Sequence, residues 1–403
     1  MSKPDILSFL NDEFLMPQPE VLEHSTKRES LFIGIPKECA FQEKRVPLVP
    51  EAVALLVSNG HKVYVESNSG LSSSFTDQEY SEAGAKICLN VKEVYEADII
   101  LKVEPPSLQE LDYFKHNQCL ISALQLKTQK AEYFKKLMDK KVTAVAFDYI
   151  KDEAQVFPIV RSMGEIAGTS SILIAAELLS TFSGGRGLLM GGIPGVKPTR
   201  VVIIGAGTVA EYAARSAVGL GALVSVFDNS VARLRRMQSD LNFPIATSIM
   251  QPKVLEKALK RADVAIGALR AKEGRTPCVI SDDMVQKMKP KSVIVDVSID
   301  QGGCFETSEL TTHESPTFIK HDVIHYGVPN IASRVAKTAS FSLSNILAPL
   351  LLKVGEGGGV KGMLLRSPNI RGGVYVYNGI ITNRGIGAWF DFPHKEIRLL
   401  LGH

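Results

Sequence analysis

The sequence predicts an α/β protein of two Rossmann-like domains, each built on a parallel sheet. Its 403 residues correspond to two or three domains at about 150 residues each. Short apolar runs alternate with stretches of helical period in two separate series, which is the pattern of parallel α/β sheets. A glycine-rich turn between a β-branched run and a helix opens the second series. Together these observations favour two α/β domains.

The first series begins at Leu31. Its expected strands are rich in β-branched and apolar residues and occupy 31–38, 62–67, 98–106, 119–126 and 142–150. Helical composition between them predicts helices over 49–60 and 130–141. The residues before Leu31 combine prolines with scattered charge, as extensions do. We therefore expect an N-terminal extension over 1–30 and the first part of one domain over 31–159.

The second series supplies the other domain. Its expected strands are again apolar and β-branched and occupy 200–207, 222–228, 263–269 and 292–299. A helical stretch over 165–182 precedes them and ends in the glycine-rich segment 183–198. A second long helix is expected over 335–359, and the tail behind it is too short to form a domain. The prediction is a domain over 160–331, followed by a linking helix and a return to the first domain over 332–403.

Composition excludes several classes of function. Lys and Arg exceed Asp and Glu by 46 to 43, a net charge of +3 without blocks of like charge, which predicts no nucleic-acid partner. The longest wholly apolar run, 346–352, is far shorter than the roughly 18 residues of a membrane span. The N-terminus lacks the features of a secretory signal, so we expect a cytoplasmic protein. Five cysteines without a C-x-x-C pair predict neither disulfides nor a metal site.

The sharpest motif is the turn that opens the second series. Four β-branched residues lead to Gly205, Gly207 and Ala210 in the spacing G-x-G-x-x-A, and Asp228 ends the next expected strand. In this fingerprint the first glycine allows a tight turn, the second admits a pyrophosphate and the alanine permits close packing of helix on sheet. The helix N-terminus offers free N–H groups to the phosphates. The motif therefore predicts a dinucleotide site rather than an ordinary glycine turn.

The acid at the end of the second strand indicates which dinucleotide is bound. Asp228 would accept hydrogen bonds from the adenosine ribose hydroxyls and repel a 2′-phosphate, which favours NAD over NADP. Arg233, five residues later, could contact a 2′-phosphate or could be a solvated helix residue. The expected cofactor is NAD, with Arg233 at the edge of its site.

The sequence also resembles a known family, that of alanine dehydrogenase and the NAD-binding subunit of proton-translocating transhydrogenase. The resemblance covers residues 31 to about 360 and is carried by IGIPKECAFQEKRVPLVPEAV, ILKVEPP, MGEIAG, GGRGLLMGGIPGVKP, IGAGTVA, VIVDVSIDQGGCFE and VPNIASRVAKTASFSLSNILAP. It implies a substrate domain made from both chain ends, with the NAD-binding Rossmann domain inserted between them. It also implies a homo-oligomer, since alanine dehydrogenases form hexamers and the transhydrogenase subunit forms dimers.

The resemblance assigns substrate contacts to two cations of the first domain. Arg45 in EKRVPL matches the family's contact to the substrate carboxylate, and Lys102 in LKVEPP matches its contact to the keto group. A guanidinium fork suits a carboxylate, and an ammonium can polarise a carbonyl. Without the motifs, both residues would be interpreted as surface cations.

Two residues of the second domain complete the implied site. Asp300 in VSIDQGG matches the aspartate beside the nicotinamide, where it would serve as a general base or hydrogen-bond acceptor. Asn330 in VPNIAS matches an amide contact to substrate or cofactor. An asparagine before a helix is also a common N-cap, so that alternative stays open.

The sequence departs from the alanine dehydrogenase pattern at two positions. Gln125 in CLISALQL stands where the family carries a catalytic histidine, and its amide can bind a carbonyl but cannot relay a proton. Gly164 stands where the dehydrogenases have a serine near the cofactor. The transhydrogenase pattern fits less well, because segment 148–163 keeps only Gln155 of an Arg, Gln and Asp set and has Pro158 at the aspartate's position.

Two histidines lie near matched motifs and could replace the missing one. His116 is part of the polar turn FKHNQ and is expected on the surface. His325 ends an expected strand that leads to Asn330. We expect both to lie outside the active site.

The resulting prediction is an NAD-dependent oxidative deamination of a small L-amino acid, as in the conversion of L-alanine to pyruvate and ammonia. Arg45 and Lys102 would hold the acid, Asp300 would act on water or the amine, and Gln125 would at most bind the carbonyl. One alternative is the NAD(H)-binding alpha subunit of a transhydrogenase, which delivers hydride to a membrane partner. Another, motivated by Gln125, is a sensor that binds NAD(H) without turnover.

Overall fold

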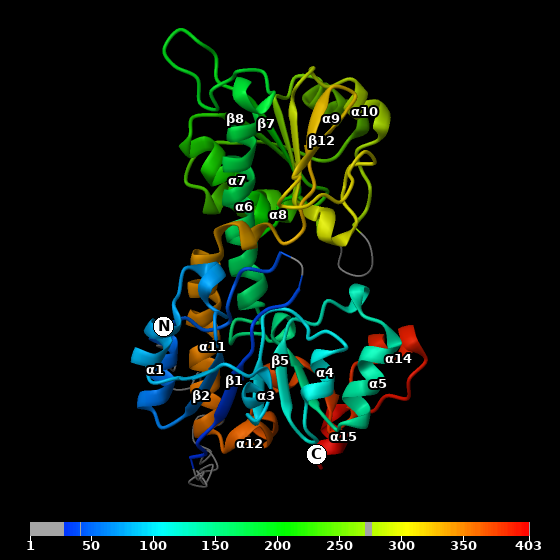
Figure 1. Ribbon diagram of the computed structural model, residues 1–403. Helices are drawn as coiled ribbons and strands as arrows, with labels where there is room; N and C mark the ends of the chain where they lie inside the picture. The colour runs from blue at the N-terminus through cyan, green and yellow to red at the C-terminus, as the bar shows by residue number, and fades with distance from the viewer. Residues whose placement is uncertain (1–27, 41, 271–275, 403) are drawn as a thin grey trace, which may run out of the picture.

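The computed structural model describes residues 28–40, 42–270 and 276–402 and shows two lobes (Figure 1). The first lobe is the lower one in Figure 1, and the second lobe is the upper one. Two long helices, α6 (Pro158–Leu178) and α11 (Ala336–Glu356), contact each other and run between the lobes. The predicted extension 1–30 lies almost entirely outside the described residues.

The sheet of the first lobe is built from the beginning and the end of the described chain. Its strands run in the order β15-β14-β6-β5-β4-β1-β2-β3. Their bounds are β1 (Phe32–Ile35), β2 (Lys62–Glu66), β3 (Lys86–Cys88), β4 (Ile99–Leu101), β5 (Cys119–Ser122), β6 (Thr143–Ala146), β14 (Val374–Tyr377) and β15 (Ile380–Ile381). β1 to β6 pair in parallel, and β14 pairs antiparallel with β6 and β15.

The sheet of the second lobe uses only the middle of the chain. Its strands run in the order β12-β13-β11-β10-β7-β8-β9. Their bounds are β7 (Arg200–Ile204), β8 (Leu223–Phe227), β9 (Ala246–Ser248), β10 (Val264–Gly267), β11 (Val293–Asp296), β12 (Thr317–Lys320) and β13 (Val323–Tyr326). All neighbours pair in parallel except β12 and β13. The predicted fold class, an α/β domain inserted into a discontinuous one, is confirmed; the domain boundaries stay a prediction.

Helices alternate with these strands. Those of the first lobe are α1 (Pro50–Ser58), α2 (Asp77–Glu82), α3 (Val91–Val94), α4 (Glu110–Tyr113), α5 (Ala131–Asp139), α12 (Gly359–Arg366), α13 (Pro368–Arg371), α14 (Arg384–Phe390) and α15 (Ile397–Leu401). Those of the second lobe are α7 (Thr208–Gly219), α8 (Val231–Asp240), α9 (Pro252–Leu259) and α10 (Asp282–Gln286). Short 3₁₀ helices are η3 (Leu71–Ser73), η4 (Leu126–Thr128), η5 (Phe147–Tyr149), η6 (Thr181–Ser183), η7 (Val297–Gln301) and η8 (Ile331–Val335).

Antiparallel strands close edges of both sheets, a feature that the predicted parallel pattern did not include. β12 and β13 are joined by His321 and Asp322, both with positive φ. β14 and β15 are joined by Asn378 and Gly379, with φ of 47° and 77°. Two-residue turns with positive φ at both positions match the twist of antiparallel pairs, and Asn-Gly is their commonest sequence. A two-residue connection is too short for the crossover that parallel pairing needs, so both strand pairs are antiparallel.

Helix α6 begins earlier than its apolar pattern predicts. We expected a helix from residue 165, and the structure begins it at Pro158. Proline suits the first turn of a helix because its fixed φ is helical and its missing N–H has no intrahelical partner there. The helix therefore extends into the segment that departs from the transhydrogenase pattern.

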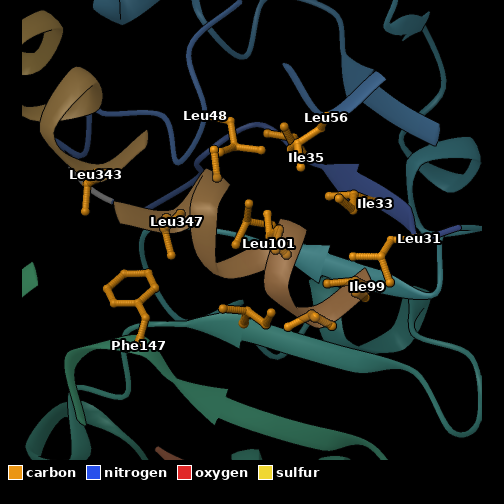
Figure 2. Close-up of a cluster of buried hydrophobic side chains, with 14 of the residues drawn as sticks. Leu31, Ile33, Ile35, Leu48, Leu56, Ile99, Leu101, Phe147, Leu343 and Leu347 are labelled. Atoms are coloured by element: carbon orange, nitrogen blue, oxygen red, sulfur yellow. The ribbon is translucent and has the colours of Figure 1, made fainter. Parts of the chain in front are cut away.

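One hydrophobic core of the first lobe lies between its sheet and α11 (Figure 2), and a second one includes Phe134 and Leu137 of α5. Leu343, Leu347 and Leu351 of α11 are buried against strand residues such as Ile33 and Leu101. Among the described residues, the stretch Ile331–Glu356 is long and apolar enough to cross a membrane, judged by length and composition only. A core helix passes the same test, and the burial of these leucines accounts for the apolar stretch.

Candidate active site

The glycine turn after β7 has the geometry that its sequence predicts. Gly205 has φ of +116°, and a Cβ there would lie 2.5 Å from the carbonyl oxygen of Ala268. Only glycine fits such a position. Gly207 is the N-cap of α7, and a Cβ there would meet nothing within 4 Å, so the space in front of the helix N-terminus is open. Ala210 is fully buried against the sheet of the second lobe.

Asp228 follows β8 and is held by backbone groups of this turn. Its carboxylate accepts hydrogen bonds from Ala206 N–H at 2.8 Å and from Ser230 N–H at 2.7 Å. The carboxylate is buried, and the Arg233 guanidinium lies 3.8 Å from it with an exposed side chain. An acid locked beside the open glycine turn fits the ribose of a dinucleotide better than a 2′-phosphate. Arg233 is therefore paired with Asp228 at the edge of this space.

The loop that carries Arg45 is fastened to the helix between the lobes by serine hydroxyls. The N–H groups of Lys44, Val46 and Val49 donate to serine oxygens at 2.8–2.9 Å. The acceptors, in the same order, are Ser333, Ser340 and Ser344 of η8 and α11. Buried N–H groups need such partners. Through these serines, a segment almost 300 residues further along the chain fixes the position of the loop that carries Arg45.

The Arg45 guanidinium is shared by two carboxyl groups. Its Nε donates to Glu43 at 2.8 Å, and one terminal nitrogen donates to Glu43 at 2.5 Å and to Glu104 at 3.3 Å. The other terminal nitrogen contacts the sulfur of Met163 at 3.4 Å. The side chains of Arg45, Glu43 and Glu104 are all buried. The predicted carboxylate-binding residue thus already has carboxyl partners within the protein.

The two glutamates differ in protonation. Burial works to raise the pKa of Glu43, but Arg45 outweighs it and lowers the pKa to about 2. Burial and the neighbouring Glu43 carboxylate raise the pKa of Glu104 to about 8, against the pull of Arg45. Glu43 is therefore the stronger ionic partner of Arg45, and Glu104 is the carboxyl group that holds a proton more readily.

Lys102 follows β4 and lies in a neighbouring buried cluster. Its ammonium contacts Glu110 at 2.7 Å, Glu38 at 3.3 Å and the carbonyl of Lys37 at 3.3 Å. Burial opposes its charge, but Glu38 and Glu110 raise its pKa above the ordinary value. Glu38 also accepts the N–H groups of Val103, at 2.6 Å, and of Glu104. Glu38 therefore joins the Lys102 cluster to the residue that contacts Arg45.

In the second lobe, Asp300 lies in η7, whose N-cap is another aspartate. Asp296, at the end of β11, accepts hydrogen bonds from the N–H groups of Ser298, Cys304 and Phe305 and from the hydroxyl of Ser308. Asp300 itself accepts the N–H of Asn330 at 3.2 Å. The residue is exposed overall, and desolvation of its carboxyl group at the junction of the lobes raises its pKa to about 6, against the effects of Asn330 and Arg45.

Asn330 connects the two lobes. Its side-chain amide donates to Glu43 at 2.7 Å, and its N–H donates to Asp300. It occupies the N-cap position of η8, as the alternative predicted, but its side chain makes no capping hydrogen bond because its amide donates to Glu43. A continuous path therefore runs from Asp300 through Asn330 and Glu43 to Arg45. The structure therefore brings the predicted residues Asp300, Asn330 and Arg45 together. Lys102 lies in the neighbouring cluster, where it contacts the carboxylate of Glu38.

Gln125 lies at the same carboxyl edge of the first sheet, behind β5. It is exposed and left-handed, with φ of 44°. Asp148 behind β6 accepts the N–H of Leu124 at 3.3 Å, and burial raises its pKa to about 6, with Arg270 of the second lobe opposing this. Sequence inspection missed Asp148, Glu43 and Glu104. Glu43 and Glu104 could have been noticed because each lies two residues from a predicted cation.

The remaining candidates fall outside this junction. His116 is exposed, as expected. His325 is buried in β13, where it hydrogen-bonds to Thr307 at 2.8 Å, stacks on Phe318 and has its pKa lowered to about 4 by burial. Gly164 lies near Thr208 and Val209 at the start of α7, and Gln155 bonds to Asn369. All five cysteines are free thiols, and the described residues include no His, Cys, Asp and Glu group suited to a metal.

A glycine turn at the carboxyl edge of one parallel sheet, opposite a charged loop at the edge of another, defines a two-lobed α/β protein of the dinucleotide-binding dehydrogenase class. The family models "Alanine dehydrogenase/PNT, N-terminal domain" and "Alanine dehydrogenase/PNT, C-terminal domain" match residues 34–167 and 171–384. The chain therefore belongs to the alanine dehydrogenase/PNT family.

Relatives of known name agree with this assignment. The chain is 39% identical over 366 residues to an alanine dehydrogenase of Methanococcus maripaludis, which covers 90% of this chain and 98% of that protein. It is also 39% identical over 365 residues to that of Bacillus subtilis, covering 90% and 96%. A solved L-alanine dehydrogenase superposes with a TM-score of 0.85 at 36% identity over 89% of this chain and 99% of the other. A transhydrogenase from Sinorhizobium meliloti superposes with a TM-score of 0.76 at 25% identity, covering 88% and 99%.

Proposed function

We propose that this chain is an NAD-dependent alanine dehydrogenase, which converts L-alanine to pyruvate and ammonia. The observation that carries the proposal is the path from Arg45 through Glu43 and Asn330 to Asp300, because it joins an acid-binding cation of one lobe to a proton acceptor of the other. The identity to alanine dehydrogenases over nine-tenths of the chain supports the same reaction.

The residues of the glycine turn fit NAD. Gly207 leaves open space in front of the first N–H groups of α7, and those groups suit a pyrophosphate. Asp228 stands at the end of β8, where it can reach ribose hydroxyls. When bound, NAD supplies the acceptor for the hydride from the substrate. The cofactor choice of NAD over NADP rests on the burial of Asp228 and on its pairing with Arg233.

The side chains at the junction have complementary tasks in this reaction. Arg45 binds the substrate carboxylate, and Lys102 contributes positive charge behind the keto group. Asp300, with a pKa of about 6, is ionised at neutral pH and accepts a proton from the amine or from attacking water. Gln125 orients a carbonyl but holds no transferable proton near neutral pH. Closure of the lobes about α6 and α11 excludes bulk water.

The test is the formation of NADH from NAD and L-alanine, followed by absorbance, with Asp300→Asn as the matched variant. We expect turnover by the natural chain and a loss of at least about a hundredfold in the variant. The absence of turnover with alanine or any other small L-amino acid at high protein concentration would overturn the proposal.

The alternative hypothesis, a transhydrogenase subunit, is supported by the superposition on a transhydrogenase and by Gln125 in place of the histidine. Co-purification with membrane-embedded subunits would support this alternative over the dehydrogenase. The sensor reading predicts tight NADH binding and no gain of activity in Gln125→His. An enzyme that lacks only a proton relay should instead gain activity in Gln125→His.

The exposed apolar side chains of the segment behind α6 support self-association. Phe182, Leu189, Ile193 and Val196 are all largely exposed, and this segment projects from the second lobe (Figure 1). Apolar groups gathered on a surface favour burial against a partner. We infer that the partner is a second copy of this chain, and light scattering of the purified protein should give a mass above that of one chain.

A further inference from the structure

The carboxyl groups around Arg45 are not equivalent. Glu43 is fully committed, since it accepts hydrogen bonds from the Arg45 N–H and guanidinium and from the Asn330 amide. Glu104 makes a single, longer contact to Arg45, at 3.3 Å, and the neighbouring Glu43 carboxylate raises its pKa, which favours the protonated form. Glu104 is therefore the partner that can be exchanged.

The contact of Glu104 lies on the part of the guanidinium that a substrate would need. Glu43 takes Nε and one terminal nitrogen of Arg45, and Met163 covers the other terminal nitrogen. An incoming carboxylate must bind at the terminal nitrogens, where Glu104 already lies. Because Glu104 is buried, its charge state changes the local field strongly.

We propose that Glu104 is a specificity-determining residue that shares Arg45 with the carboxylate of a monocarboxylic 2-oxo acid or amino acid. With a proton on Glu104, the substrate carboxylate binds beside a neutral carboxyl group that can donate a hydrogen bond to it. Without that proton, Glu104 pairs with Arg45 itself and repels the substrate. The inference rests on the proposed function and names a residue that the family resemblance does not assign.

Glu104 is the carboxyl group of this cluster whose pKa, at about 8, lies within the range of pH 6 to pH 10 that the experiment below covers. The charged groups that face this cluster are Glu43, Arg45, Glu38, Lys102, Asp300 and His313. The pKa of Glu43 is lowered to about 2, that of Asp300 is raised only to about 6, and burial lowers that of His313. Arg45 and Lys102 have raised pKa values and stay charged. Burial raises the pKa of Glu38 as well, with Lys102 and two backbone N–H groups opposing this, so only a variant of Glu104 can assign the effect.

The first experiment uses the unaltered chain saturated with NADH and measures the binding of pyruvate by titration calorimetry. Pyruvate has no group that titrates between pH 6 and pH 10, so any pH dependence belongs to the protein. Since binding needs a proton on Glu104, the Kd should be flat below about pH 8 and rise about tenfold per pH unit above it. In two buffers of different ionisation enthalpy, binding above this pH should take up about one proton per pyruvate.

The second experiment repeats the titration with Glu104→Gln, which keeps the shape and a hydrogen-bond donor but cannot ionise. The rise in Kd and the proton uptake should both vanish. Glu93→Gln, which removes an exposed carboxyl of the same lobe bonded to Lys86, is the matched control and should behave as the natural chain. If Glu104→Gln fails to fold, an absence of proton uptake in the natural chain still overturns the inference, and Glu38→Gln, which should keep the uptake, separates the two carboxyl groups.

The possible outcomes separate this inference from the proposed function. A pH-independent Kd in the natural chain, or an unchanged pH dependence in Glu104→Gln, overturns the role of Glu104 even if alanine is oxidised. Proton-linked pyruvate binding that is lost in Glu104→Gln supports that role even if no amino acid is turned over. Failure of pyruvate to bind at any pH overturns it as well.

Discussion

The two lobes prepare their ligand sites in opposite ways. In the second lobe the site is made by backbone: a glycine with positive φ, an open helix N-terminus and an aspartate held by two N–H groups. In the first lobe it is made by buried charges that neutralise one another, Arg45 with Glu43 and Lys102 with Glu110. The proposed nucleotide half is therefore preformed, whereas the proposed acid half would exchange an internal partner for its ligand.

The variant with the largest expected effect is Gly205→Ala, which tests whether the backbone of the glycine turn builds the site of the second lobe. Left-handed strain costs about 1–3 kcal/mol, and the new Cβ would overlap the Ala268 carbonyl oxygen at 2.5 Å. We expect the free energy of unfolding to fall by more than about 3 kcal/mol, as measured by denaturant titration, with loss of NADH binding.

Gly207→Ala, in the same turn, is the control for that variant. Its φ is ordinary, at −93°, and the added Cβ enters open space. Stability should stay within about 0.5 kcal/mol, while NADH binds more weakly because the methyl group occupies the space of the pyrophosphate. Equal destabilisation by the two alanines would contradict a backbone-built site.

Ser340→Ala tests the attachment of the first-lobe loop. Ser340 is fully buried and accepts the N–H of Val46 at 2.9 Å. Removing the hydroxyl leaves that N–H without a partner, which costs about 1–3 kcal/mol of stability. We expect kcat/KM for alanine to fall while the Kd of NADH stays unchanged, because the nucleotide turn is not attached to this serine.

Ser342→Ala is the matched control on the same helix, since Ser342 makes no hydrogen bond to the described residues of the 43–49 loop. Stability and kinetics should both stay near those of the natural chain. A parallel loss of NADH affinity in Ser340→Ala would show that the two sites are not independently built.

The pKa of Asp300 predicts opposite pH trends for activity and stability. Desolvation raises the pKa of Asp300 from 3.8 to about 6, so the acceptor form is lost below about pH 6 and kcat/KM should fall up to tenfold per pH unit. Because the folded state holds this proton more tightly than the unfolded chain, the contribution of Asp300 to stability is greatest at low pH and declines as the pH rises from 3.8 to about 6. Unfolding measured against pH in the natural chain and in Asp300→Asn checks the second trend.

The glycine turn could be predicted from sequence because its residues are near neighbours. Gly205, Gly207, Ala210 and Asp228 lie within one strand-helix-strand unit, whose spacing determines their geometry. Hydrophobic runs likewise predicted the central strands of both sheets. The antiparallel edge strands were not predicted, because β12, β14 and β15 are only two to four residues long and lie outside the two series of alternating apolar runs.

The acid site could be predicted only in part. The family motifs pointed to Arg45, Asp300 and Asn330, but no spacing in the sequence reveals that Asn330 donates to Glu43 across 287 positions. The compensation of Arg45 and Lys102 by glutamates depends on burial, which follows from the packing of α11 on the first sheet. Motifs therefore identified single residues of the site, whereas the contacts between them depend on tertiary packing that the sequence pattern does not reveal.

The smallest expected effect belongs to Arg233, at the edge of the nucleotide half. Its guanidinium is 3.8 Å from Asp228 and its side chain is 46% exposed, so the ion pair contributes little to stability, about 0–1 kcal/mol. Arg233→Ala should leave the free energy of unfolding and the Kd of NADH nearly unchanged. It removes, however, the guanidinium that lies 3.8 Å from Asp228.

That loss should appear only with a 2′-phosphate present. NADPH would then face Asp228 without a compensating cation, so its affinity should fall about threefold to tenfold in Arg233→Ala, measured by fluorescence titration. Arg235→Ala, an exposed cation on the same helix, should change neither affinity. If NADH weakened as much as NADPH, Arg233 would be part of the preformed backbone site rather than its edge, and the contrast between a backbone-built half and a charge-built half would no longer hold for the second lobe.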